Sequence, residues 1–476
     1  MGMSPRGAFV LVAGVLLIAI GLSFEGIRGL IKYIQLLRGA FGGGEAGTPP
    51  QEMVLPPTFE DFCLFMGVIC ILAVVVGLPA FRFSAIGGAI KIERTLDKEK
   101  VFMGEYCHVS LHVTNTSRTR IDFLEIYDPI SEALQLSVGE NYITTRIDPG
   151  QTISFSYILR TTQRGKFTIG PTRIIIYDRM GFYFEEEIVG DATTILVLPE
   201  YTDIKRMDAL AHRRQIGMLF GVHKTRQIGL GDRFHALRPY MPGDEFRRID
   251  WKAFARTQKL IVREFEIERN IRVMIFLDCS GSMGAGIPNN TKLDFSIRAA
   301  MLLAHMALER KDLVGMAIYS DKVHQYITPG AGKRTFFDIL ENLALVEPGG
   351  MANPLKAVNY IIRREPRPAF YVFLTDLEGA RAERIIDAIR KARTTKNPVT
   401  VVAPFGPFFE ARIEELSPVE KALAEAIAEE YLGVRRKVER ALKRFEVDVV
   451  NVGPDDYLPI VIKEYYTAKR LGKGMM

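Results

Sequence analysis

Three oxygen-bearing side chains follow one apolar segment of the sequence at every second position. Asp278, Ser280 and Ser282 come directly after the run IRVMIFL. Because that run is typical of a buried strand, the spacing allows one carboxylate and two hydroxyls to face a common point above the strand end. A set of hard oxygen ligands that leaves some coordination positions open suits Mg2+ or Mn2+. Such an ion keeps waters in the open positions and can take a further carboxylate from outside. The sequence therefore predicts a divalent-metal site at this strand end.

The same segment resembles the metal-ion-dependent adhesion site of the von Willebrand factor type A domain, which begins with the pattern D-x-S-x-S. The resemblance implies a threonine from a later loop and an aspartate from the end of another strand. Asp376, which closes FYVFLTD, matches the aspartate, a role often played through a water. Met351, in the loop GGMAN, stands where that family has threonine, and a thioether is a poor ligand for a hard ion. Three alternatives stay open: Asn353 lends its amide oxygen, the metal binds weakly, or the fold is kept as a metal-free scaffold.

A second polar cluster lies upstream, where acidic, basic and aromatic residues stand close together. Its core reads PGDEFRRIDWKAFART and includes Arg247, Arg248, Asp250 and Trp251, the only tryptophan of the chain. This core, with the following VREFEIER, resembles the signature of the bacterial and archaeal domain-of-unknown-function family fifty-eight. The residues predict either an ion-pair network with an aromatic anchor between domains or a partner-binding surface, since Arg and Trp often anchor interfaces. The interdomain role is the favoured alternative.

Two apolar runs near the amino terminus predict membrane-spanning helices. Residues 7–24 and 62–81 carry no charged side chain, and about 20 apolar residues cross a bilayer as a helix. We therefore expect a membrane anchor over residues 1–94, with two transmembrane helices and a connecting loop. A cleaved signal peptide is the alternative interpretation of the first run.

The distribution of basic residues predicts the topology of this anchor. Two spans place both of its ends on one side of the membrane, where four Arg and Lys lie near the spans, against three in the connecting loop. The four cysteines are scattered, which suits a reducing compartment. We expect a two-pass protein of the cell membrane with its soluble domains in the cytoplasm.

The hydrophobic pattern changes twice after the anchor. Residues 95–200 alternate with a period of two between turn clusters, which predicts a β-sandwich. Residues 201–270 are interpreted as a linker that carries the signature motif. Over residues 271–476 strand-like runs alternate with amphipathic helices, which predicts an α/β doubly wound domain, von Willebrand factor A-like by the resemblance above. The expected fold class is two transmembrane helices, an all-β sandwich and this α/β domain.

Composition restricts the function. A net charge of +6 over 476 residues is no signature of nucleic-acid binding, and we expect no nucleic-acid partner. Among the seven histidines only His108 and His112 are close in sequence, and they lie in the strand-like run YCHVSLHVTN, which argues against a zinc enzyme. Because no motif combines a nucleophile with a convincing base, we expect no enzymatic activity.

The two resemblances together imply a membrane-anchored adaptor or scaffold that binds protein partners through its von Willebrand factor A-like domain. Proteins with this resemblance are commonly associated with MoxR-type AAA+ ATPases in the assembly or maturation of protein complexes. A partner carboxylate would complete the coordination of the metal. One alternative is a metal-dependent hydrolase with Asp376 or Glu378 as its base. Another is a structural membrane protein with a degenerate metal site, for which Met351 is the best evidence.

Overall fold

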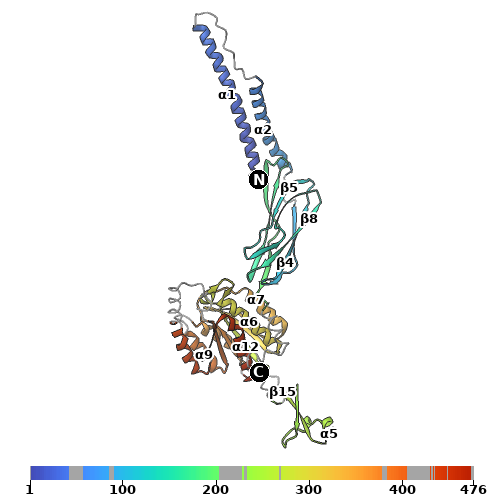
Figure 1. Cartoon of the computed structure of the whole chain (residues 1–476), viewed down its shortest axis with the longest axis vertical. Helices are drawn as coiled ribbons and strands as arrows, with labels where there is room; N and C mark the ends of the chain where they lie inside the picture. Colours follow the sequence, from blue (N-terminus) through green and yellow to red (C-terminus); the bar gives the residue numbers. More distant parts are fainter. Residues whose placement is uncertain are drawn as a thin grey trace. The chain divides into compact units, whose positions relative to one another are not determined.

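The chain divides into two compact units in the computed structural model (Figure 1). The first comprises Met1–Val101, Glu105–Thr162 and Phe167–Ile195, and the second Phe102–Gly104, Gln163–Lys166 and Leu196–Met476. The structure describes residues 2–41, 57–84, 90–202, 228–229, 233–266, 270–377, 383–404, 429, 432–433, 435–447 and 449–472.

Two long apolar helices open the first unit. They are α1 (Pro5–Phe41) and α2 (Pro57–Ser84), which lie side by side in Figure 1. A Cβ added to Gly67 would come within 2.8 Å of the carbonyl oxygen of Gly14, so small residues allow the two backbones to approach closely here. α1 is longer than its uncharged run, because the amphipathic residues that follow continue the same helix.

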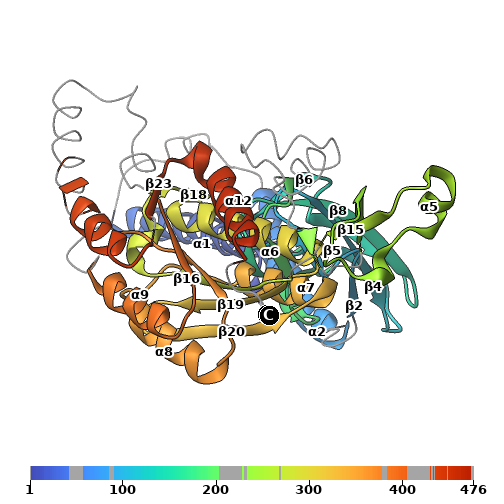
Figure 2. The ribbon, with the colours of Figure 1, turned by 90° about the horizontal axis from the view of Figure 1, so that it is seen from below.

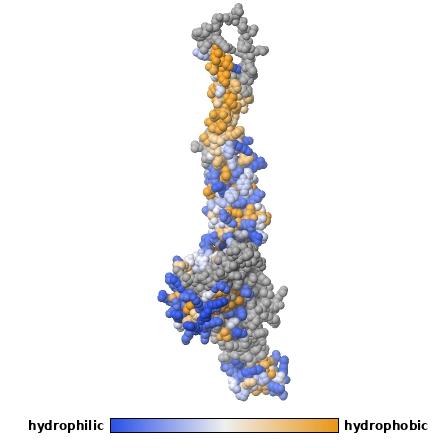
Figure 3. Space-filling model, turned by 60° about the vertical axis from the view of Figure 1, so that its left-hand side comes forward, coloured by the Kyte–Doolittle hydropathy of each residue, from blue (hydrophilic) through white to orange (hydrophobic). Residues whose placement is uncertain are grey.

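Both helices are suited to a membrane. Pro5–Ile34 and Asp61–Leu78 are long and apolar enough to cross one, and few of their side chains are buried within the protein. Figure 3 shows the resulting apolar surface along α1 and α2. These helices indicate a membrane protein, as the two uncharged runs predicted.

The β-structure that follows contains three sheets. The inward side chains of β4, which include Val109, Leu111 and Val113, are completely buried and alternate with more accessible ones, as the sequence pattern predicted. The sheets have the orders β1-β11-β10-β5-β7, β2-β4-β8-β6 and β3-β12-β9. The strands are β1 (Gly2–Met3), β2 (Ile90–Leu96), β3 (Lys100–Phe102), β4 (Tyr106–Asn115), β5 (Ile121–Tyr127), β6 (Leu134–Val138), β7 (Tyr142–Ile147), β8 (Thr152–Thr161), β9 (Gly165–Ile169), β10 (Thr172–Tyr177), β11 (Tyr183–Val189) and β12 (Thr193–Leu198).

The boundary between anchor and sandwich differs from the expected one at residue 95. β2 starts at Ile90 and pairs with β4, so five residues assigned to the anchor belong to the sandwich sheet. Gly2 and Met3 also join a sandwich sheet, where they pair with β11. Two residues are too few to show a period of two, so this strand has no signal in the sequence pattern.

Residues 201–270 are more than a linker. Three strands form the sheet β13-β15-β14, with a 3-10 turn and a short α-helix between β14 and β15. The expectation of a linker was wrong for residues 233–266, because these strands are short and carry charges on both faces, which hides their period. Their bounds are β13 (Ile228–Gly229), β14 (Arg233–Pro239), η1 (Phe246–Arg248), α5 (Trp251–Thr257) and β15 (Ile261–Glu266). We call residues 233–266 the signature module.

The rest of the second unit is an α/β domain with a six-stranded sheet. The strand order is β20-β19-β16-β21-β22-β23, which is 3-2-1-4-5-6 in order of sequence, and all pairs are parallel except that of β19 with the edge strand β20. This is a doubly wound order. The strands are β16 (Arg272–Asp278), β19 (Leu313–Tyr319), β20 (Val323–Gly330), β21 (Phe370–Leu374), β22 (Val399–Pro404) and β23 (Val449–Val452), and a small hairpin joins β17 (Gly286–Ile287) and β18 (Asn290–Thr291).

Helices cover both faces of this sheet, and each face has its own core. α6, α7 and α12 pack with Val273, Ile275 and Leu277 of β16. α8 and α9 pack on the other face with Met274 and Phe276. Figure 2 shows α6 and α12 on one side of β16 and β19, and α8 and α9 on the opposite side. The helices are α6 (Lys292–Glu309), α7 (Gly332–Ala344), α8 (Pro354–Arg364), α9 (Arg384–Thr394) and α12 (Pro454–Arg470).

Candidate functional site

The candidate site lies at the carboxyl end of β16, in the middle of the six-stranded sheet. All seven residues of β16 are buried, as expected for a strand with a parallel neighbour on each side and helices on both faces. Its connection leads to β19 on one side, and β21 lies on the other, so the strand order reverses here. Ligands of doubly wound sheets bind at such a switch point, beyond the carboxyl ends of the strands.

Asp278 ends β16 and is completely buried. Its carboxylate accepts a hydrogen bond of 2.8 Å from the Ser280 backbone N–H and one of 2.5 Å from the Thr375 hydroxyl, which comes from the loop after β21. Burial raises the pKa of Asp278 to about 6, although these two hydrogen bonds oppose the rise. Thr375 was not among the predicted site residues.

The two predicted serines lie beside Asp278. Ser280 is buried, Ser282 is exposed, and their hydroxyl oxygens are 3.3 Å apart. The short helix η2 (Gly281–Gly284) starts here, so the chain turns tightly and keeps both hydroxyls at the strand end. The structure thus brings Asp278, Ser280 and Ser282 together, as their spacing predicted.

Asp376 reaches the same strand end from the loop after β21, and a lysine is its neighbour. The Lys292 Nζ lies 3.6 Å from Asp376 Oδ2, and the two side chains are only 2% and 6% exposed. Lys292 is the first residue of α6. Sequence reasoning missed it, because a lysine that opens an amphipathic helix is ordinarily solvated.

The loop at 349–353 also reaches the site, through its backbone. The Gly281 N–H donates to the Gly350 carbonyl at 3.1 Å, and the Gly349 N–H donates to the Cys279 carbonyl at 2.8 Å. Met351 is 55% exposed. Asn353 is the N-cap of α8, since its amide oxygen accepts a 3.2 Å hydrogen bond from the Lys356 N–H. The oxygen expected to replace the missing threonine therefore already has a helix-capping partner.

A pocket of about 320 Å³ adjoins these loops. It combines the acidic Asp321 and Glu347 with the apolar Leu345 and Val346, and it is lined by Cys279, Ile318, Ser320, Asp321, His324, Gln325, Asn342, Leu345, Val346, Glu347, Gly349 and Gly350. Its lining therefore offers both charged and apolar contacts to a molecule that binds there.

Ser320 and His324 form a serine–histidine pair in this pocket, as the catalytic triads of hydrolases do. The Ser320 Oγ lies 2.7 Å from His324 Nε2. In a catalytic triad a carboxylate would orient the histidine through Nδ1. Here Asp321 accepts from the Ser320 hydroxyl at 3.1 Å and lies 3.9 Å from the same Nε2. The pair therefore lacks the orientation that nucleophile activation requires.

The signature residues have two kinds of role in the signature module. Asp250 is the N-cap of α5, because its carboxylate accepts from the backbone N–H groups of Lys252 and Ala253, both at 3.0 Å, and Arg263 pairs with it at 3.1 Å. Arg248 pairs with Glu245 at 3.3 Å.

The other two signature residues face outward. Arg247 is exposed, and Trp251 is 60% exposed with its ring edge-to-face against Phe254. Their accessibility leaves these two side chains available to a partner, whereas Asp250 stabilises the module itself.

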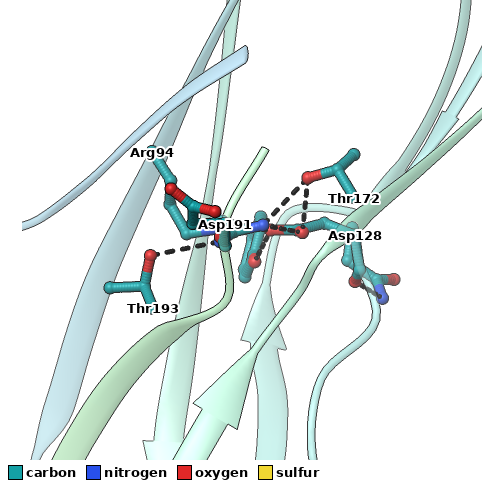
Figure 4. Close-up of polar contacts among 7 residues, drawn as sticks. Arg94, Asp128, Thr172, Asp191 and Thr193 are labelled. Atoms are coloured by element: carbon teal, nitrogen blue, oxygen red, sulfur yellow. Dashed lines mark hydrogen bonds and ion pairs between the residues drawn. The ribbon is translucent and has the colours of Figure 1, made fainter. Parts of the chain in front are cut away.

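A buried charge cluster in the sandwich had not been predicted (Figure 4). The Arg94 guanidinium forms a two-pronged pair with Asp128, at 2.5 and 3.1 Å, and both side chains are at most 4% exposed. Tyr157 and Thr172 donate hydroxyl hydrogen bonds to the same carboxylate, and Arg94 also donates to the Asp191 carbonyl. The cluster is fully hydrogen-bonded and closed to solvent, so it ties strands together and offers no ligand site.

These features define a class of protein: a membrane-associated chain with a β-sandwich and an α/β domain. Two family models match it. Residues 236–443 match the family described as "Protein of unknown function DUF58", and residues 94–197 match the "BatD DUF11 like domain". The first match supports the resemblance found in the signature motif. The second coincides with the sandwich and begins at Arg94 of the buried charge cluster.

Curated relatives match parts of the chain. An uncharacterized protein of Mycobacterium tuberculosis is 25% identical over 179 residues, which are 37% of this chain and 56% of the relative. The uncharacterized protein YeaD of Bacillus subtilis is 25% identical over 228 residues, which are 46% of this chain and 52% of that protein. The chain spans about half the length of the curated relatives it matches.

Solved structures resemble this chain less than the curated relatives do. An aerotolerance-related membrane protein from Bacteroides fragilis is 17% identical with a TM-score of 0.28, and the match covers 42% of this chain and 99% of that one. A CARDB domain from Pyrococcus furiosus is 12% identical with a TM-score of 0.18, over 23% of this chain and 94% of that one. TM-scores this low support no statement about function.

Proposed function

We propose that the chain is a membrane-anchored adaptor or scaffold that binds protein partners through the loops at the carboxyl end of its six-stranded sheet, in a domain of the von Willebrand factor A-like kind. The observation that carries the proposal is the meeting of the loops after β16 and β21 with the loop at 349–353. Backbone hydrogen bonds hold the first and last of these together, at 2.8 and 3.1 Å. They form a fixed group of loops beside a pocket, at the end of the sheet where ligands of doubly wound domains bind, which supports recognition of a partner here.

The proposed partner is a MoxR-type AAA+ ATPase that acts in the assembly or maturation of protein complexes. The family match over residues 236–443 supports this partner through the association common among such proteins. The exposed Arg247 and Trp251 offer a second contact surface of the composition found in interface hot spots. The proposal includes a two-pass anchor and a cytoplasmic location of the soluble domains.

Mg2+ or Mn2+ at the site remains a prediction, and the residues present fit such an ion only in part. Asp278, Ser280 and Ser282 lie at the same strand end, and the two serine hydroxyls are 3.3 Å apart, which supports the prediction. Asp376, however, contacts Lys292, and Met351 offers no hard oxygen. Because this donor set falls short of the geometry that Mg2+ demands, the adaptor proposal is made without a metal bridge.

The alternative of a structural membrane protein with a degenerate metal site is favoured by the same two residues, Lys292 and Met351. The alternative of a metal-dependent hydrolase finds less support. Its candidate base Asp376 is already engaged by Lys292, whose Nζ lies 3.6 Å from the carboxylate. The other candidate, Glu378, lies outside the described residues.

The proposal is tested by binding of a purified MoxR-type ATPase from the same organism to the full-length chain in detergent micelles. Leu345→Asp, which places a charge at the mouth of the pocket, is the test variant. Asp387→Lys on α9 is the matched control, because it also alters charge on this domain but lies outside the pocket. We expect wild type and control to retain the ATPase and Leu345→Asp to lose it. No retention by wild type, or equal retention by all three chains, would contradict the proposal.

A further inference from the structure

Lys292 is a buried cation that the proposed function does not use. Its side chain is 2% exposed, although lysine is among the residues least often buried. Removal of an ammonium from water is unfavourable unless an opposite charge compensates it. A lysine in this position therefore indicates a local requirement for positive charge.

The place of Lys292 in its helix strengthens this argument. The capping box of Thr291 and Asp294 fixes the start of α6, and Lys292 is its first residue. The positive end of the helix dipole lies there, and it disfavours a cation. Both burial and the helix dipole thus oppose an ammonium at this point, so the local carboxylates must outweigh them.

Those carboxylates belong to the predicted metal site. Asp376, which the resemblance assigns to an ion through a water, lies 3.6 Å from Lys292 Nζ. Asp278 is completely buried, and the charge of Asp376 acts on it. Two buried carboxylates at the ends of neighbouring strands favour a cation, and Lys292, which lies beside Asp376, provides one that is covalently part of the chain. A divalent ion in the same place would be repelled by that ammonium.

We propose that the Lys292 ammonium is the resident cation of this site, which neutralises its buried carboxylates in place of a divalent metal ion. The wild-type chain then binds Mg2+ and Mn2+ weakly, and a partner is not held through a metal bridge. The proposal does not depend on the adaptor function, since it concerns the occupant of the site and not what the surrounding surface binds.

The test is Mn2+ binding to the full-length chain in detergent micelles, measured from the electron paramagnetic resonance signal of free Mn2+. Lys292→Met removes the ammonium and keeps an unbranched side chain of similar length. We expect this variant to bind Mn2+ roughly tenfold more tightly than wild type, or better, because the repulsion is gone. The double variant Lys292→Met with Asp278→Asn should lose that gain.

Lys333→Met is the matched control. Lys333 also lies in the first turn of a helix, α7, but it is exposed. We expect its replacement to leave Mn2+ binding at the wild-type level. If Lys292→Met proves unstable, its thermal midpoint should rise with added Mn2+ while that of wild type stays unchanged by Mn2+ or chelator, because only a ligand of the folded state stabilises it.

Two results would overturn the proposal. One is micromolar binding of Mn2+ by the wild-type chain that Asp278→Asn abolishes, which would show that the metal and Lys292 coexist. The other is a Lys292→Met variant, folded by circular dichroism, whose Mn2+ affinity and thermal response equal those of wild type.

Discussion

At the scale of single residues, this chain uses buried charge in two different ways. The pair of Arg94 and Asp128 is surrounded by hydroxyl and carbonyl partners that satisfy both groups. Lys292 and Asp376 instead meet at 3.6 Å, beyond hydrogen-bond distance, at a strand end where ligands commonly bind. The first arrangement ties strands of the sandwich together, and the second places a buried cation beside a carboxylate at the candidate site.

Replacement of Asp128 by alanine should destabilise the sandwich strongly. Arg94 would remain as a buried cation, and removal of one partner of a buried pair costs about 3–5 kcal/mol. Chemical denaturation monitored by circular dichroism measures the loss. Asp122→Ala is the control, since its carboxylate pairs with Arg120 at the surface and should contribute less than about 1 kcal/mol. Equal losses for both variants would show that the cluster adds no stability.

Two thiols should be unreactive in the folded chain. Burial, aided by the charge of Asp97 near Cys107 and of Asp278 near Cys279, raises the pKa of both thiols to about 12. At pH 8 we expect iodoacetamide to label neither residue until denaturant is added, as judged by peptide mass spectrometry. Rapid labelling of either one under native conditions would contradict its buried position.

The raised pKa values of Cys107 and Cys279 also predict how the free energy of unfolding depends on pH. The unfolded thiols ionise near their ordinary pKa of 9.0, whereas the folded ones keep their protons to higher pH. Their contribution to stability is therefore complete below pH 9 and declines as the pH rises from 9 towards 12. Cys107→Ser and Cys279→Ser together should flatten the fall of the thermal midpoint over that interval.

At the scale of elements, the sequence predicted those with long and regular patterns. The apolar run of β16 and the alternation in β4 identify both strands, and the order of strands and helices predicts the doubly wound sheet that positions Asp278. Elements without such patterns were not predicted from the sequence. β1 has two residues, and charged side chains hide the strands of the signature module. The place of Lys292 in the site was not predicted, because its burial depends on the packing of α6 against the sheet, a tertiary contact that local sequence does not show.

In the signature module, we expect Asp250 to contribute to stability and Trp251 to contribute to binding of the partner. Asp250→Ala removes the N-cap of α5 and the ion pair to Arg263, so we expect a lower free energy of unfolding and faster hydrogen exchange in residues 251–257. Trp251→Ala removes an exposed ring and should change stability by less than about 0.5 kcal/mol. Retention of the ATPase should fall with Trp251→Ala. A large loss of stability in that variant would favour an interdomain role for the ring.

At the scale of the whole molecule, the two apolar helices are suited to the membrane, and the sandwich and the α/β domain are suited to water. α1 and α2 expose apolar side chains along most of their length, which is stable only in lipid or detergent. The α/β domain has a core on each face of its sheet, and the core of the sandwich also includes Val74 of α2. An adaptor needs this division, because the anchor confines it to the membrane while the strand-end loops remain accessible to soluble partners.

This division makes the topology decisive for the proposed partner, since an AAA+ ATPase consumes cytoplasmic ATP. The four-to-three bias of basic residues towards the side of the soluble domains is small, so a reporter is needed. Fused to the carboxyl terminus of the full chain, green fluorescent protein should fluoresce and alkaline phosphatase should be inactive. Fusions after residue 45, in the connecting loop, should give the opposite result, which controls for expression and for the presence of two spans. Active phosphatase at the carboxyl terminus would place the strand-end loops outside the cytoplasm and remove the ATPase as a partner, while the measurements on Lys292 would keep their meaning.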